Sequence, residues 1–115
     1  MRGIYFINEQ IKINGLSKTE SYQLQEQSLL NWIKTNEIQP VKLNPHQLNT
    51  HYTILHALLY DLKAANFQLD CFCFYSNEVL DDFITTYPAR WLMIKSYFDR
   101  IIPVSSHEES WGKVV

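Results

Sequence analysis

The sequence predicts an α/β domain, a three-layer sandwich in which helices cover both faces of a mostly parallel sheet of about four strands. Residues 69–75 (LDCFCFY) are apolar on both faces, a pattern typical of a central strand that is covered on two sides. Short strand-like runs alternate with segments of helical periodicity, in the order strand, helix, strand, helix, strand, helix, helix, strand. Because crossovers between parallel strands are right-handed, this order places helices on both faces.

The amino-terminal third is expected to hold a strand over residues 3–8, a loop over residues 9–16 and a long helix. Ser17 and Glu20 match a capping box, in which the hydroxyl and the carboxylate satisfy free backbone amides at the start of a helix. The helix should end near Asn36. Its apolar stripe is expected to consist of Tyr22, Leu29 and Ile33, widened by Leu30 and Trp32.

A short second strand is expected over residues 40–44, ending before Pro45. Asn49 or Thr50 then caps a second helix that runs to about Ala65. The buried face of this helix is expected to hold His51, Ile54, Leu55, Leu58, Leu59, Leu62 and Ala65.

After the central strand, Ser76 or Asn77 is expected to cap a short helix, whose apolar residues are Val79, Leu80, Phe83 and Ile84. Pro88 suits the first turn of a further helix over residues 89–98, with Trp91, Ile94, Tyr97 and Phe98 on its apolar side. Residues 100–105 form the last expected strand, which Pro103 favours placing near a sheet edge.

At 115 residues the chain is long enough for one domain with its own core. We expect this domain over residues 1–106 and a tail over residues 107–115, in which Trp111 is a candidate for docking back. The net charge of −2 argues against direct nucleic-acid binding, because such binding depends on Lys and Arg neutralising phosphates. No apolar run approaches the roughly 20 residues that cross a bilayer, and the amino terminus is too short and too polar for a signal peptide. We therefore expect a cytoplasmic protein without membrane contact.

Cys71 and Cys73 lie two residues apart on the expected central strand. Their parallel side chains favour a pair of buried free thiols over a strained disulfide. The histidines lack zinc-binding spacing, and no serine lies in a Gly-x-Ser-x-Gly motif. The sequence thus predicts no catalytic residue, no metal site and no cofactor, and the chain is expected not to be an enzyme.

Several segments match the framework of a known family. They are residues 5–9 (YFINE), 21–29 (SYQLQEQSL), 58–62 (LLYDL), 67–72 (FQLDCF) and 101–106 (IIPVSS). In these segments the chain resembles the amino-terminal domain of serine recombinases, the resolvase and invertase family. The resemblance spans roughly residues 3–106 and implies a resolvase-like or flavodoxin-like sheet, in a protein of bacterial or phage origin.

The catalytic positions of that family differ in this chain. Glu9 falls nearest the family's nucleophilic serine, and Ile7 replaces the arginine two residues before it. Glu78 and Val79 stand in the segment where the family has arginines that stabilise the phosphoryl transition state. The resemblance therefore implies vestigial active-site positions and a domain without recombinase activity.

The leading hypothesis is a non-catalytic, resolvase-like domain that acts as a protein-interaction or regulatory module. Aromatic side chains on a polar helix flank are typical interface anchors, which makes Tyr52, His56 and Tyr60 candidate contacts. Leu24 is a further candidate, because it falls opposite the apolar stripe of the first helix. The expected partner is an unidentified protein, with a homodimer left open.

Two alternatives remain. In the first alternative, the chain is an accessory DNA-binding or site-specific recombination factor, and a gel shift at low salt would test this. In the second alternative, the chain is an enzyme that acts on a small ligand, with a site formed by Asn8, Glu9, Ser76 and Asn77. These four residues follow expected strands and should converge at the carboxyl edge of the sheet.

Overall fold

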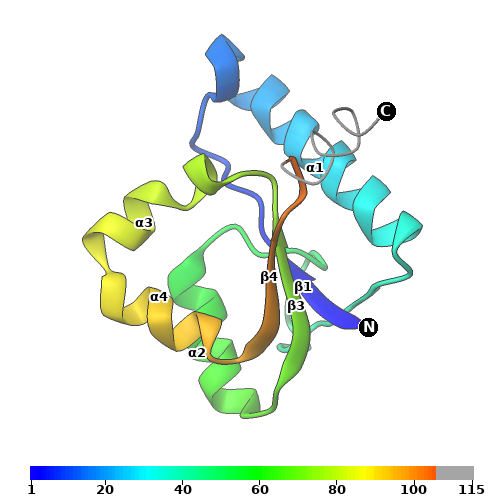
Figure 1. Cartoon of the computed structure of the whole chain (residues 1–115), viewed down its shortest axis with the longest axis vertical. Coiled ribbons are helices and arrows are strands. Elements are labelled where there is room, and N and C mark those ends of the chain that lie inside the picture. Colours follow the sequence, from blue (N-terminus) through cyan, green and yellow to red (C-terminus); the bar gives the residue numbers. More distant parts are fainter. Residues whose placement is uncertain (106–115) are drawn as a thin grey trace.

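A four-stranded, all-parallel sheet forms the centre of the computed structural model, which describes residues 1–105 (Figure 1). Its strands are β1 (Arg2–Tyr5), β2 (Gln39–Pro40), β3 (Leu69–Phe74) and β4 (Phe98–Pro103), in the spatial order β2-β1-β3-β4. The predicted fold class is confirmed. The domain boundary at residue 106 and the tail with Trp111 lie outside the described residues.

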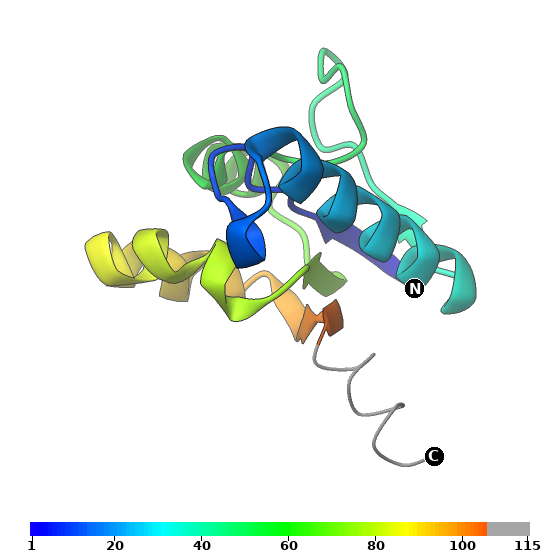
Figure 2. The same ribbon diagram turned by 90° about the horizontal axis from the view of Figure 1, so that it is seen from above.

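Helices cover both faces of this sheet. The long helix α1 (Lys18–Thr35) lies on one face, and α2 (Leu55–Ala65), α3 (Asp81–Thr86) and α4 (Pro88–Lys95) lie on the other (Figures 1 and 2). Short 3-10 turns, η1 (Ile13–Gly15) and η2 (Asn77–Val79), precede α1 and α3. Within residues 1–105, no helix combines the length and apolar character that crossing a membrane requires.

Alternation along the strands divides the core into two clusters. Ile4, Phe72 and Phe74 pack with the side chains of α2 and α4. Their neighbours Tyr5 and Cys73 point the other way and pack with the apolar residues of α1. Successive buried residues of β1 and β3 therefore alternate between two apolar layers, as a sheet covered on both faces requires.

β3 is the central strand that its sequence predicted. It pairs with β1 on one side and β4 on the other, and five of its six residues are buried. Gly3 of β1 lies against it so closely that a Cβ atom at this position would come within 2.6 Å of the Cys71 Sγ. Glycine at position 3 thus allows the two strands to pack around the cysteine side chain.

The capping box of α1 is present with both of its hydrogen bonds: the Glu20 N–H donates to the Ser17 hydroxyl, and the Ser17 N–H donates to the Glu20 carboxylate. The buried stripe of the helix differs from the predicted one, because it begins with two polar residues. It consists of Ser21, Gln25, Leu29 and Ile33.

Two leucines of α1 correct the predicted stripe. Leu30 was expected within it but is 47% exposed. Leu24 was expected to face solvent, yet it is half-buried and packs against the core cluster under α2. The start of α1 extends beyond the carboxyl ends of the strands (Figure 1), and Leu24 there meets residues of the core cluster on the other face.

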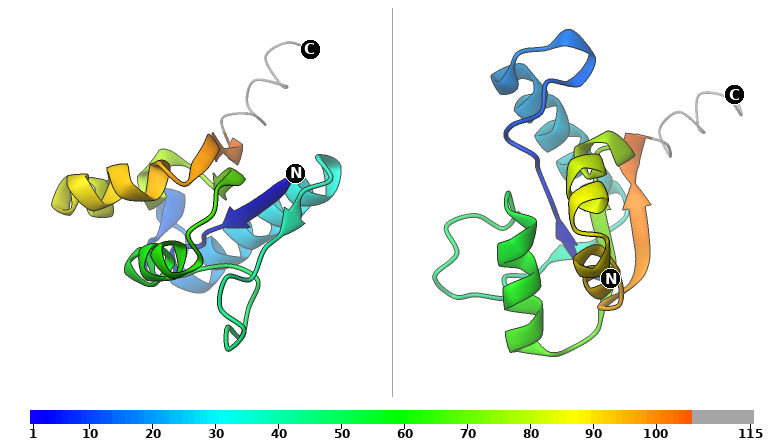
Figure 3. Two further views of the ribbon diagram at one scale, coloured as in Figure 1. Left: turned by 90° about the horizontal axis from the view of Figure 1, so that it is seen from below. Right: turned by 90° about the vertical axis from the view of Figure 1, so that its left-hand side faces the viewer.

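The second strand and second helix are both shorter than predicted. β2 has only two residues, since the chain turns away at Asn44, whose side chain and carbonyl accept hydrogen bonds from His46 and Gln47. The first part of the resulting loop over residues 41–54 projects from the body of the domain (Figures 2 and 3). α2 begins at Leu55 and lacks the predicted Asn49 or Thr50 cap.

The start of α2 corrects the predicted buried face as well. Ile54 is 58% exposed, whereas His51 is buried but belongs to the loop. Towards the carboxyl terminus, α4 ends at Lys95 and β4 already starts at Phe98, so Tyr97 and Phe98 do not belong to the helix. Pro103 lies on an edge strand, as predicted.

Candidate functional site

The carboxyl ends of β1 and β3 form the switch point of this sheet, because the chain leaves β1 towards β2 and leaves β3 towards β4, in opposite directions. In open α/β sheets, ligands bind in the crevice outside the strand ends at such a point. Figure 1 shows the two loops that leave these ends on the same edge of the sheet. The residues of these two loops are therefore the candidates for a ligand-binding site.

The end of β1 is held on both sides by backbone hydrogen bonds. The Phe6 N–H donates to the Cys73 carbonyl at 3.0 Å, towards β3. On the other side, the Tyr52 N–H donates to the Tyr5 carbonyl and the Ile7 N–H donates to the Tyr52 carbonyl. Tyr52 thus pairs with β1 in the place of a longer β2, through an isolated parallel bridge that precedes α2.

This pairing buries Tyr52, so its side chain does not belong to the surface stripe predicted for it. The ring is 5% exposed, and its hydroxyl donates a hydrogen bond to the Asp61 Oδ2 at 2.7 Å. Burial, together with this hydrogen bond to a carboxylate, raises the pKa of Tyr52. We therefore remove Tyr52 from the candidate contact residues.

Asn8 ties the loop after β1 to the loop after β3. Its Nδ2 donates to the Val79 carbonyl at 3.0 Å, and its Oδ1 accepts from the Gln10 N–H at 2.9 Å. The Gln25 side chain of α1 binds the Asn8 backbone twice, accepting from the N–H at 2.9 Å and donating to the carbonyl at 3.0 Å. Asn8 is thus a structural bridge at the switch point.

Gln25 was missed at the sequence level, although a signal for it exists. The buried residues of α1 recur every four positions, and extending Leu29 and Ile33 backwards at this spacing reaches Gln25 and Ser21. A polar residue on a buried stripe needs a hydrogen-bond partner. Its partner here lies in the loop that leaves the sheet.

A cleft of about 440 Å³ opens at the switch point. It is lined by Phe6, Asn8 and Gln10 after β1, by Thr53 and Leu55 before and in α2, and by Val79, Asp82, Phe83, Thr86 and Tyr87. Its walls combine apolar rings with hydroxyl and amide groups, and Asp82 is the charged residue among those described. This mixture is typical of ligand pockets.

An aromatic cluster forms the rim of the cleft and joins α2 to α3 and α4. The His56 ring stands edge-on to Tyr87 and Phe83, with centroid distances of 4.6 and 5.1 Å. Arg90 donates a hydrogen bond to the His56 Nδ1 at 2.8 Å, and its guanidinium lies 5.3 Å from the centroid of the Tyr87 ring. His56, a predicted contact residue, is therefore half-buried within this cluster.

Beyond the cluster, the outer faces of α2 and α4 expose large apolar side chains. Tyr60, a predicted contact residue, is 75% exposed, and Leu92 and Met93 of α4 are 63% and 40% exposed. Leu92 and Met93 were not among the predicted contact residues. The signal was available, since both fall outside the stripe formed by Trp91 and Ile94.

The four positions that the recombinase resemblance implies are vestigial have different surroundings. Ile7 is fully buried under α1, and Val79 is buried in the opposite core cluster. Glu78 is exposed and accepts a hydrogen bond from the Ser76 hydroxyl. Glu9 is exposed and lines a separate hollow of about 290 Å³ with Lys18, Thr19 and Tyr22.

The expectation that Asn8, Glu9, Ser76 and Asn77 form one site stays a prediction, and the Asn8–Val79 hydrogen bond joins the two loops that carry these residues. Of these four residues, Asn8 lines the switch-point cleft and reaches Val79, while Glu9 faces the hollow beside α1. Asn77 begins η2, and the Ser76 hydroxyl is engaged with Glu78.

A buried histidine connects α1 to the 41–54 loop. The His51 Nε2 and the Tyr22 hydroxyl are hydrogen-bonded at 3.1 Å, and the Tyr5 hydroxyl is hydrogen-bonded to Thr50 at 2.6 Å. Burial lowers the pKa of His51, against the opposing influence of Glu26 and Glu9. Burial likewise raises the pKa of Tyr22.

Cys71 and Cys73 are free and buried, as predicted, with their sulfur atoms 3.9 Å apart. The hydrogen bond between them, followed by burial, raises the pKa of Cys73. Across residues 1–105, no three His, Cys, Asp or Glu side chains gather in a way that could hold a metal ion.

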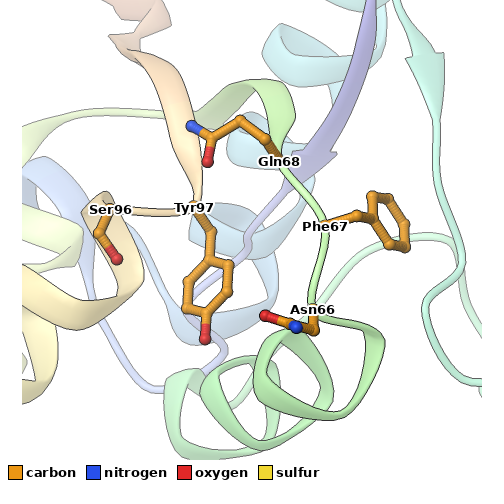
Figure 4. A pocket seen from close by; sticks show the side chains of 5 residues that line it. All are labelled: Asn66, Phe67, Gln68, Ser96 and Tyr97. Atoms are coloured by element: carbon orange, nitrogen blue, oxygen red, sulfur yellow. The ribbon is translucent and has the colours of Figure 1, made fainter.

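A further hollow of about 360 Å³ lies at the opposite edge of the sheet (Figure 4). Asn66, Phe67 and Gln68 line it from the turn before β3, and Ser96 and Tyr97 from the turn before β4. The Phe67 ring points away from Tyr97, towards the Arg2 guanidinium 5.3 Å from its centroid. Because ligands of α/β sheets bind beyond the carboxyl ends, we assign the candidate site to the switch-point cleft.

Comparison of the chain with protein-family models, curated proteins and solved structures found no match. The resemblance to serine recombinases therefore stays a prediction.

Proposed function

We propose that this chain is a protein-interaction module that binds its partner through the α2–α4 face, defined by His56, Tyr60, Tyr87, Leu92 and Met93. The observation that carries the proposal is the exposure of large apolar and aromatic side chains on these neighbouring helices: Tyr60 is 75% exposed and Leu92 is 63% exposed. A single exposed apolar residue is ordinary, but a patch built from several of them marks an interaction surface.

Contacts between the helices support treating these residues as one surface. His56 of α2 touches Tyr87 and Arg90 at the start of α4, which brings the outer faces of the two helices together. Tyr60 follows His56 by one helical turn, and Met93 follows Arg90 by one turn, so both lie further along the same joined face. Tyr, Met and Arg are enriched at protein interfaces.

The regulatory role on a resolvase-like framework is the fuller form of this proposal. It is supported by the framework segments of the sequence and by the apolar packing of Ile7 and Val79, which stand where the family would carry arginines. On this proposal, the domain acts by binding a partner protein and catalyses no reaction.

The test is capture of a partner from a lysate of the source organism by the tagged full chain, compared with a Tyr60→Ala, Leu92→Ala double variant. We expect the double variant to lose the captured protein and to keep the melting temperature of the parent chain, because both side chains are largely exposed. Leu30→Ala is the matched control, since Leu30 is 47% exposed on α1, across the sheet. Equal capture by all three proteins would refute the proposed surface.

A further inference from the structure

The switch-point cleft adjoins the α2–α4 face, because Phe83 and Tyr87 belong both to its wall and to the aromatic cluster. We propose that this cleft binds the guanidinium group of an arginine side chain that the partner presents. The inference rests on the proposed function and adds the chemistry of the group that is recognised.

The charge of the cleft favours a cationic occupant. Asp82 of α3 contributes a carboxylate, and the described lining residues include no lysine or arginine. A carboxylate accepts two parallel N–H groups from a guanidinium, a pairing that adds direction to the charge attraction. An anionic group would meet Asp82 without a cation in the lining to offset it.

The rings of the cleft favour a flat cation over a compact one. Phe83 and Tyr87 line the same cleft as Asp82, so the cleft offers ring surface as well as a carboxylate to a bound group. A guanidinium stacks on such rings and also presents a fork of donors, whereas an ammonium is a strongly hydrated point charge. The Tyr87 ring already has the Arg90 guanidinium 5.3 Å from its centroid, which shows that it accommodates this group.

Two cations reach the rim, and each is held by a residue of the domain. Arg90 donates to His56, and the Lys18 Nζ donates to the Gln10 Oε1 at 3.1 Å. The positive charges of Arg90 and Lys18 repel a second cation and so weaken its binding in the cleft. Removing the charge of Arg90 should therefore tighten binding of a guanidinium, whereas removing the charge of Asp82 should weaken it.

The experiment is an NMR titration of the ¹⁵N-labelled full chain with N-acetyl-L-arginine methylamide. The probe should shift the amide signals of Gln10, Thr53 and residues 82–87 together, with one dissociation constant. The matching citrulline derivative, which has the same shape without the charge, should bind at least about tenfold more weakly, as should the matching lysine derivative. Signals that respond equally to all three compounds would refute recognition of a guanidinium.

Variants provide the matched controls. Asp82→Asn should weaken binding of the arginine probe by about tenfold or more, because a charge-assisted pair is lost. Asp81→Asn removes the same charge one residue away, outside the lining of the cleft, and should change the affinity by less than about threefold. Arg90→Gln should tighten binding. If Asp81→Asn and Asp82→Asn had the same effect, or if Arg90→Gln weakened binding, the proposal would be wrong.

The titration and the capture experiment test the guanidinium site and the interaction surface independently. Partner capture that needs Tyr60 and Leu92, together with an arginine titration that shifts no cleft signal, overturns the guanidinium site and leaves the interaction surface standing. An arginine titration that behaves as expected, with capture unaffected by Tyr60→Ala and Leu92→Ala, supports the guanidinium site and overturns the surface. If both proposals hold, Asp82→Asn reduces capture of the partner as well.

Discussion

Replacing Gln25 with methionine tests how the loop after β1 is held. Methionine has a similar length and fills the same buried position, but it cannot hydrogen-bond to the Asn8 backbone. Two groups, the Asn8 N–H and carbonyl, lose their partners. A buried backbone group without a partner costs about 1–3 kcal/mol, and because Asn8 is half-buried we take the lower end for each group, which amounts to about 2 kcal/mol.

The assay is thermal unfolding followed by circular dichroism. For a domain of this size, a loss of 1 kcal/mol lowers the melting temperature by about 4 °C, so Gln25→Met should unfold about 8 °C below the parent chain. Gln23→Met is the control, because it makes the same chemical change at an exposed position on the same helix. If Gln25→Met were as stable as Gln23→Met, the hydrogen bonds to Asn8 would not hold the loop.

Gln25→Glu adds a pH-dependent check of the same reasoning. An ionised carboxylate still accepts from the Asn8 N–H, but it cannot donate to the Asn8 carbonyl, so the variant should be destabilised at neutral pH. Burial raises the pKa of a carboxyl group above its unfolded value of about 4.3. The folded variant therefore binds a proton more readily than the unfolded one, and its deficit in unfolding free energy should shrink as the pH falls towards 5. A deficit that stays constant with pH would contradict the proposed donor.

Three further predictions concern other parts of the fold. Gly3→Ala should lower the free energy of unfolding, measured in urea, by about 1–3 kcal/mol, because the new Cβ meets the Cys71 Sγ. Adding Cys71→Ala should recover part of this loss. Additive effects of the two substitutions would rule out that contact. Ser17→Ala should destabilise the domain by about 1 kcal/mol, because the cap of α1 is lost. Ser28→Ala, inside the same helix, should be neutral or slightly stabilising. Equal melting temperatures of the two variants would disprove the capping role. Because the folded-state pKa of His51 is lowered, the unfolded chain binds the proton more readily, so stability should decline as the pH falls below about 6.5. Urea unfolding at several pH values should show a flatter decline for His51→Gln, and parallel curves for the two proteins would count against this histidine as the cause.

The parts of the fold that were predicted correctly depend on local patterns. Residues 69–74 are apolar on both faces, and this alone indicates a strand covered on two sides, as β3 is. The capping box at Ser17 and Glu20 involves atoms only three residues apart, so its geometry follows from the sequence. Pro103 lacks a backbone N–H, which suits the edge strand where it lies.

The errors arose where a distant partner decides the local structure. Residues 51–54 were expected to be helical, but the Tyr52 backbone pairs with the end of β1, more than 40 residues away, and is extended for that reason. The same pairing turned Tyr52 from a candidate surface residue into a buried one. Gln25 was overlooked because its partner, the Asn8 backbone, comes from a separate element.

For the candidate site, the sequence by itself pointed to the edge of the sheet but not to the residues that form the cleft there. Alternating strands and helices with right-handed crossovers predict a parallel sheet, and this is enough to locate its carboxyl edge, although the spatial order of the strands comes from the structure. The meeting of Asp82, Phe83 and Tyr87 with Thr53, and the contact of His56 with Arg90, depend on how α2, α3 and α4 pack on one face. Local patterns specify elements because their interactions are short-range. The cleft is made from three separate stretches, residues 6–10, 53–55 and 79–87, and it exists only after the long-range packing that brings them together.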